Sequence, residues 1–216
     1  MTTVLNGTGG TELKTFASLL NLPNAASIEN QFHRIEKDLI IPTAIQLQEE
    51  ALNEALIEEG KLEMQKLGYS DEDIKQWLME DSWEGRNAIC QVGLHASYDM
   101  GWQKRGSGNS YSSTSGHGFL VGTNTNKLLA VSIKSTRCRK CEDAQKKGNA
   151  VEEHVCFINY EGSSGGMEPE ASLEMIKNIQ NDTKNAIFIA TICADDTTTL
   201  TCIIKNARDG GKLPTI

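Results

Sequence analysis

Residues 186–193 (AIFIATIC) form an almost wholly apolar run, which limits the possible fold classes more than any other stretch of the chain. A short apolar run between a helical pattern and a polar segment is typical of a β-strand buried on both faces of a sheet. The run is followed by Ala194 and then by Asp195 and Asp196. It therefore predicts an α/β domain in which a buried strand presents acidic side chains at its end.

The preceding hundred residues supply the other elements of such a domain. Residues 88–98 (AICQVGLHASY) predict a strand that ends at Asp99, and 117–122 (HGFLVG) with 128–136 (LLAVSIKST) predict a hairpin around the turn 123–127. A helix with Pro169 in its first turn follows, and residues 197–207 predict a second helix. The expected order, β-β-β-α-β-α, is that of a ribonuclease-H-like mixed sheet cut off before the fold is complete.

The N-terminal third has a helical pattern instead. Residues 43–67 repeat apolar positions at helical spacing with glutamates opposite, and Ser70 begins a capping-box-like start to another helix. We therefore expect a helical region at 1–86 and a partial ribonuclease-H-like catalytic domain at 87–216, with a Cys/His insertion at 137–156. The helices form an annex packed on the sheet, or, alternatively, two short helices joined at residues 22–24 form a helix-turn-helix DNA reader.

Composition limits the classes of partner. The 216 residues contain no apolar run of the roughly 20 residues that a membrane span needs, and the first residues lack the regions of a signal peptide, so we expect an intracellular protein without membrane association. The net charge is −8, yet residues 99–150 hold nine basic and three acidic residues, a local net charge of +6. Only this middle segment suits the phosphates of a nucleic acid.

The acidic residues predict a catalytic metal site. Phosphoryl transfer by two metal ions needs carboxylates that converge on Mg²⁺ or Mn²⁺ ions about 3.5–4 Å apart. Asp99 and Asp195 follow strands that are neighbours in a ribonuclease-H-like sheet, and Glu168 begins the helix between them. Taken singly, an aspartate after a strand is more often a turn former or helix cap. Which of Asp195 and Asp196 is the ligand stays open.

Four candidate ligands for a second metal lie in the basic segment and directly after it. Cys138 and Cys141 are two residues apart, and His154 and Cys156 follow them, which gives the four nitrogen and sulfur ligands of a structural zinc site. Unligated thiols and a disulfide are the alternatives. Zinc would order a stretch with few apolar residues. The residues that would then hold the DNA backbone, unless they only form a solvated basic loop, are Arg137, Arg139, Lys140, Lys146 and Lys147.

Six blocks of the sequence share the motifs of one known family. The blocks are 98–106 (YDMGWQKRG), 116–118 (GHG), 137–142 (RCRKCE), 154–156 (HVC), 159–169 (NYEGSSGGMEP) and 194–199 (ADDTTT). They resemble the Mutator-like transposase domain, and the resemblance covers roughly residues 32–204. The most specific block is the one around the first aspartate, which resembles the family's Asp-Gly-x-Trp-Gln-x-Arg-Gly context.

The resemblance implies a DDE-type transposase that uses Mg²⁺ or Mn²⁺ to cleave and join DNA strands at transposon ends. It also implies action in the nucleus. Whether the protein forms a homo-oligomer stays open. It implies Asp99 and Asp195 as catalytic ligands. Lys104 and Arg105 are expected to contact phosphate, and Trp102 is expected to pack against the sheet.

Two departures qualify the resemblance. Met100 stands where the family has a small residue, and the family's third acid has no counterpart before Ile216 unless Glu168 replaces it. Two alternatives to an active transposase domain therefore stay open. One is an inactive or domesticated fragment, folded around zinc, that binds DNA or protein. The other is a ribonuclease-H-like nuclease that uses Asp99, Glu168 and Asp195. Whether the gene continues past Ile216 is also open.

Overall fold

The computed structural model describes residues 34–103 and 113–194, which belong to two compact units, Met1–Ala51 and Leu52–Ile216. In the first unit, the π-helix η1 (Glu36–Ile40) leads directly into α4 (Ile41–Lys66). Pro42 is the second residue of α4, and because η1 runs into α4 without a break, its missing N–H group removes one backbone donor from a continuous helical stretch. Apolar side chains in this helical stretch, including Leu39 and Ile45, are exposed.

The second unit begins with the rest of α4, followed by α5 (Asp71–Met79) and α6 (Trp83–Ile89). The hydroxyl of Ser70 accepts a 3.1 Å hydrogen bond from the N–H group of Asp73, which confirms the predicted helix start. Arg86 lies over the rings of Trp77 and Trp83, 5.5 and 4.9 Å from their centres, and its Nε donates to the carbonyl of Trp77. This stacking ties α5 to α6.

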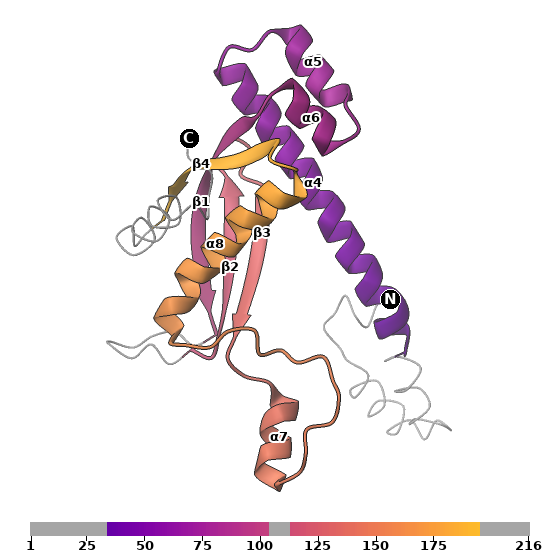
Figure 1. Ribbon diagram of the computed structural model, residues 1–216, viewed down its shortest axis with the longest axis vertical. Coiled ribbons are helices and arrows are strands. Elements are labelled where there is room, and N and C mark those ends of the chain that lie inside the picture. The colour runs from indigo at the N-terminus through magenta and orange to yellow at the C-terminus, as the bar shows by residue number, and fades with distance from the viewer. Residues whose placement is uncertain (1–33, 104–112, 195–216) are drawn as a thin grey trace, which may run out of the picture. The chain divides into compact units, whose positions relative to one another are not determined.

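A four-stranded mixed sheet follows, in the order β3-β2-β1-β4 (Figure 1). Its strands are β1 (Val92–Trp102), β2 (Ser115–Gly122), β3 (Leu128–Ser135) and β4 (Ile187–Cys193). The first three pair antiparallel, and β4 pairs parallel to β1. The predicted order of strands and the intervening helix is confirmed over the described residues, whereas the helix predicted at 197–207 lies outside them.

One face of the sheet is covered by α8 (Ser164–Asp182), which crosses the strands diagonally (Figure 1). Every second residue of β1 points to this helix and is buried, because side chains alternate between the faces of a strand. The helix contributes Met167, Ala171, Met175 and Ile179 to the same core. We call this the covered face.

The opposite face carries exposed side chains over the described residues, and we call it the open face. Phe119 and Ile133 are 38 and 54% exposed there, and Thr191 and Cys193 of β4 are exposed as well. The prediction that β4 is buried on both faces is therefore wrong, and Cys193 is exposed rather than part of the core. The apolar sequence of β4 correctly predicted a strand, but within this strand only Ile187 and Ile189 are buried in the core.

Three boundaries differ from the predicted ones. The first strand begins at Val92 because α6 occupies residues up to Ile89, and it runs through Asp99 to Trp102 rather than ending at Asp99. Helix α8 begins at Ser164, so Glu168 and Pro169 lie inside it rather than at its start. A further helix, α7 (Arg139–Lys147), lies in the stretch that was expected to be irregular.

Helix α4 is fastened to the β2–β3 turn by a buried carboxylate. Glu59 accepts hydrogen bonds from the N–H groups of Asn124 and Thr125, both at 2.9 Å, and from the hydroxyl of Thr125 at 2.7 Å. A side chain at Gly122 would collide with this carboxylate, so glycine is required there. The helical residues from Leu52 onward thus belong to the same unit as the sheet, and a domain boundary at 86/87 stays a prediction. No helix among the described residues is long and apolar enough to span a bilayer.

Candidate functional site

Asp99 lies on the open face of β1, where its side chain is exposed. It is paired across the sheet with Phe119 of β2, and its Oδ1 accepts a 2.8 Å hydrogen bond from the N–H group of Met100. The residues on either side of it, Tyr98 and Met100, are buried on the covered face. Met100, the residue that departs from the family pattern, therefore packs in the core rather than beside the aspartate.

The register between β1 and β4 brings the second acidic segment alongside the first. A one-residue shift follows the pairing of Leu94 with Ile189, after which Ser97 pairs with Cys193. Both Ser97 and Cys193 are exposed, so both lie on the open face. Asp195 and Asp196 lie outside the described residues.

Glu168 approaches β1 from the other side. The hydroxyl of Tyr98 donates a 2.9 Å hydrogen bond to the backbone carbonyl of Glu168, on the covered face. Burial raises the pKa of Tyr98, and the charges of Glu168 and Asp99 add to this, so the phenol stays protonated and can donate. The side chains of Asp99 and Glu168 thus start from opposite faces of the sheet.

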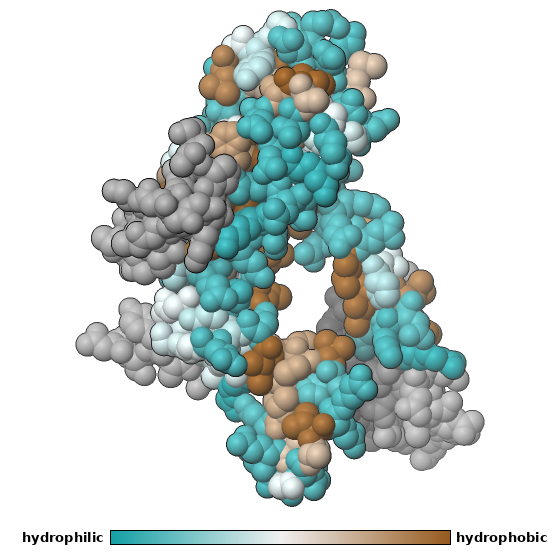
Figure 2. Space-filling model, viewed as in Figure 1, coloured by the Kyte–Doolittle hydropathy of each residue, from teal (hydrophilic) through white to brown (hydrophobic). Residues whose placement is uncertain are grey.

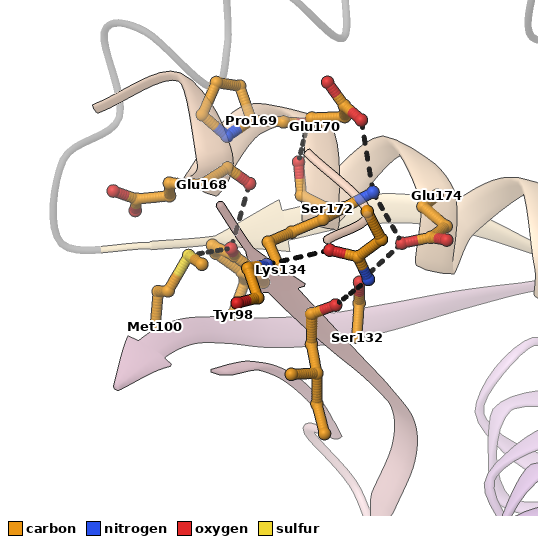
Figure 3. A network of polar contacts seen from close by, with 12 residues as sticks. Tyr98, Met100, Ser132, Lys134, Glu168, Pro169, Glu170, Ser172 and Glu174 are labelled. Carbon is orange, nitrogen blue, oxygen red and sulfur yellow. Dashed lines mark hydrogen bonds and ion pairs between the residues drawn. The ribbon is translucent and has the colours of Figure 1, made fainter. Parts of the chain in front are cut away.

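A buried lysine on β3 holds α8 in place (Figure 3). The amine of Lys134, whose side chain is 6% exposed, lies 3.1 Å from Glu170 and 3.0 Å from Glu174. Ser132 donates a 2.5 Å hydrogen bond to Glu174. Burial alone would lower the pKa of Lys134, but its hydrogen bonds to both glutamates outweigh it and raise that pKa. Lys134 is one of the nine basic residues in 99–150, and it faces inward because it shares a face of β3 with the buried Ser132.

The four predicted zinc ligands converge. The ligand atoms of Cys138, Cys141, His154 and Cys156 all lie within 4.8 Å of one another. Nε2 of His154 is 3.2 Å from Sγ of Cys138 and 3.5 Å from Sγ of Cys141, and the Sγ atoms of Cys141 and Cys156 are 3.6 Å apart. Tetrahedral zinc, with bonds of about 2.0–2.3 Å, separates its ligand atoms by about 3.6–3.8 Å. The cluster therefore fits one zinc ion.

The surroundings of the cluster suit a metal. Nδ1 of His154 lies 2.9 Å from the carbonyl of Glu152, a contact that orients the ring and leaves Nε2 directed at the sulfur atoms. The backbone N–H groups of Phe157 and Cys141 lower the pKa of Cys138 to about 6, which favours the thiolate that zinc binds. Burial and the neighbouring thiols raise the pKa of Cys141 to about 11, so without a metal this thiol stays protonated. All five described cysteines are free thiols.

The cluster organises a small lobe that consists of residues 137–158. Cys138 immediately precedes α7, and His154 and Cys156 lie in the return segment, so a metal would join the two. Arg137 is paired with Glu142 through two contacts, whereas the Arg139 side chain is 94% exposed and lies 3.9 Å from Asp143. Lys140, Lys146 and Lys147 are exposed on the same helix. The predicted phosphate contacts Lys104 and Arg105 lie outside the described residues.

Hydrophobic side chains interrupt the hydrophilic surface of the lobe (Figure 2). Val155 and Phe157, on either side of the ligand Cys156, are 84 and 69% exposed. At the base of the lobe, Asn159 accepts from the N–H group of Ser135 and donates to the carbonyl of Ile133. Asn159 thus continues the hydrogen bonding of β3 with a side chain, a role that its place in the sequence did not signal.

The tryptophan after the first aspartate packs as predicted. Trp102 is partly buried against the core, and its ring lies over Gly116 of the neighbouring strand.

Comparison with known proteins gives one match. A family model described as Mutator-like transposase matches residues 1–213. No curated protein and no solved structure gives a significant match. Transposases act on DNA, so the match also implies DNA binding in general. With nearly the whole chain covered, the protein belongs to the Mutator-like transposase family.

Proposed function

We propose that the chain carries part of the catalytic centre of a DDE-type transposase, in which Asp99 and Asp195 hold Mg²⁺ or Mn²⁺ for cleavage and transfer of DNA strands. The pairing of Ser97 with Cys193 supports this most directly. Asp99 lies two residues further along β1, and Asp195 follows Cys193 by two residues in the sequence. If the parallel pairing continues, the two carboxylates meet on the open face, because residues two apart on a strand share a face.

The sheet supports a ribonuclease-H-like fold for this domain. Three antiparallel strands, a helix and a fourth strand parallel to the first are arranged so that β1 and β4 are neighbours, which the two-aspartate site requires. Glu168 is the weaker third ligand, because its backbone is tied to the covered face. Action in the nucleus and on transposon ends belongs to the same proposal.

The second metal has a structural role in this proposal. Zinc at Cys138, Cys141, His154 and Cys156 would order α7 and the segment that returns from it. The exposed cations of α7 would then contact the DNA backbone and increase affinity without selecting a sequence. Arg137 is less suited to this, because Glu142 already occupies its guanidinium group.

A nicking assay tests the catalytic part of the proposal. Supercoiled plasmid is incubated with the full chain and Mn²⁺, and wild type is compared with Asp99→Ala, Asp195→Ala and Asp182→Asn. Asp182 is an exposed acid at the end of α8 and serves as the matched control. We expect nicking to fall to background in the first two variants and to persist in the third. Equal nicking in wild type and Asp99→Ala would refute the assignment.

The zinc cluster and the basic α7 favour a second candidate, a domain that binds DNA without cutting it. Binding to a labelled duplex distinguishes the two. Under this alternative, replacing Arg139, Lys140 and Lys146 together weakens binding and reduces its salt dependence, while wild type shows no nicking with any divalent ion. Nicking that depends on Asp99 would exclude the alternative.

A further inference from the structure

Two histidines lie on the open face, and they differ in what surrounds them. His95 of β1 lies 3.5 Å from the carboxylate of Glu63, through its Nε2. His117 of β2 is half-buried, and its imidazole has no hydrogen bond or ion pair within the described part of the chain. A half-buried imidazole without a polar partner is suited to a ligand that arrives from outside.

The register places His117 beside the proposed metal site. In the β1–β2 pairing, Asp99 is opposite Phe119 and Gly101 is opposite His117. Asp99 and His117 are therefore diagonal neighbours on one face. The separation typical of such neighbours is about 7–8 Å between backbones, and somewhat less between side chains. Metal–oxygen bonds of about 2.1 Å on the aspartate leave room for a phosphate group between the metal and the imidazole.

Gly101 lies beside both residues on this face and contributes no side chain. A Cβ atom added there would lie in ordinary van der Waals contact, 3.8 Å from the carbonyl of His117 and 3.9 Å from the ring of Phe119, so that ring borders the space between His117 and Asp99. The bulky neighbours Met100 and Trp102 are on the other face, against Gly116.

We propose that His117 donates a hydrogen bond to a non-bridging oxygen of the DNA phosphate that is bound through the divalent ion at Asp99. This inference rests on the proposed function, because it needs a metal-bound phosphate at that place. The metal neutralises one side of the phosphate, and the imidazole N–H group binds an oxygen that the metal leaves free. His117 therefore contacts the DNA phosphate, and binding of the metal at Asp99 does not require His117.

The proposal is tested by the gain in DNA affinity that a divalent ion provides. Fluorescence anisotropy of a labelled duplex gives the Kd of the zinc-loaded full chain with and without added Ca²⁺, in buffer cleared of other divalent ions without a chelator. The ratio of the two Kd values is the metal-dependent gain. The variants are His117→Leu, which keeps the bulk, and His117→Gln, which keeps an N–H donor. His95→Gln is the matched control, and Asp99→Asn tests the metal site itself.

We expect the gain to fall about tenfold in His117→Leu, which is the size of a lost hydrogen bond to a charged group. It should stay within about twofold of wild type in His117→Gln and His95→Gln, since both leave a donor beside Asp99. A packing role for His117 predicts the reverse order, with leucine tolerated and glutamine not. Ca²⁺ binding measured by calorimetry should be unchanged in His117→Leu.

The outcomes separate the two assignments. If Asp99→Asn loses the gain but His117→Leu keeps it, the role of His117 is refuted and the metal site stands. If Asp99→Asn keeps the gain, the proposed metal site itself fails. A wild type without any gain refutes both.

Discussion

The body of the second unit and the Cys/His lobe are ordered by different means. In the body, α8 and the sheet bury a continuous set of apolar side chains, from Leu94 and Leu120 to Met167 and Met175. In the lobe, α7 contains no buried residue, and Cys138 is the buried apolar side chain at its start. A segment that buries so little cannot offset the entropy of ordering its backbone without another source of free energy. From this difference we expect a metal at the Cys/His cluster to stabilise the lobe and to have little effect on the body.

The largest expected effect comes from removing zinc. Treating the chain with a strong chelator, or replacing Cys138 and Cys141 with serine, should abolish hydrogen-exchange protection over residues 137–158, because the ligands hold α7 to the return segment. Protection in β1, β2 and α8 should stay within experimental error of wild type. Exchange measured by mass spectrometry compares the two regions in one experiment, and atomic absorption should show one zinc per untreated chain.

A control variant makes this result specific. Cys90 is a half-buried thiol outside the lobe, so Cys90→Ser should leave both the zinc content and the lobe protection unchanged. Loss of protection in the body on chelation would contradict the contrast drawn above.

An intermediate effect is expected at the polar contacts between α8 and β3. Lys134→Met removes the charge but keeps the length of the side chain, and it should lower the free energy of unfolding by about 1–2 kcal/mol, since its glutamate partners are half-exposed. Chemical denaturation measures this change. Zinc content should be unaffected, because the lysine serves the body.

The same contacts predict a pH dependence. Burial alone would raise the pKa of Glu174, but hydrogen bonds from Ser132 and Lys134 outweigh it and lower that pKa below the ordinary 4.5. A carboxylate with a lowered pKa in the folded state stabilises the fold above its unfolded pKa and loses this effect as the pH falls through the folded value. Stability should therefore fall less steeply below about pH 4.5 in Glu174→Gln than in wild type. Equal slopes would show that this carboxylate contributes nothing.

The smallest effect is expected where the two regions join. Asn159→Ala removes two hydrogen bonds between the base of the lobe and β3, and since the site is exposed the cost should be about 1 kcal/mol of unfolding free energy. Asn149→Ala, at an exposed position in the lobe, is the matched control and should change stability by less than about 0.5 kcal/mol. Equal effects of the two changes would argue that the junction is not held by Asn159.

Local sequence patterns predicted the helices and strands well, but they predicted less well which side chains are buried and which are exposed. Strand alternation and the cap at Ser70 each depend on neighbouring residues, so the sequence is sufficient for them. The face on which Glu168 lies and the exposure of Cys193 depend on which helix covers which side of the sheet. Residue spacing contains no information on that choice.

The Cys/His cluster and the contacts of Lys134 differ in the same way. The ligands Cys138 and Cys141 are close in sequence and their convergence with His154 follows from spacing and chemistry alone. Glu170, one of the two partners of Lys134, is on a helix 36 residues away, which no local pattern indicates. His117 belonged to a block of the family resemblance, but its position beside Asp99 needed the register of the β1–β2 pairing.

The buried Glu59 has a consequence for the order in which the chain folds. Until the β2–β3 turn exists, this carboxylate has none of its three donors, and leaving it buried without them would be unfavourable. The helix cannot dock early and wait for the hairpin, although it leaves the ribosome first. Helix and hairpin are therefore expected to form in one cooperative step, with backbone amides of residues 55–63 and 118–130 becoming protected at the same rate in pulse-labelling experiments.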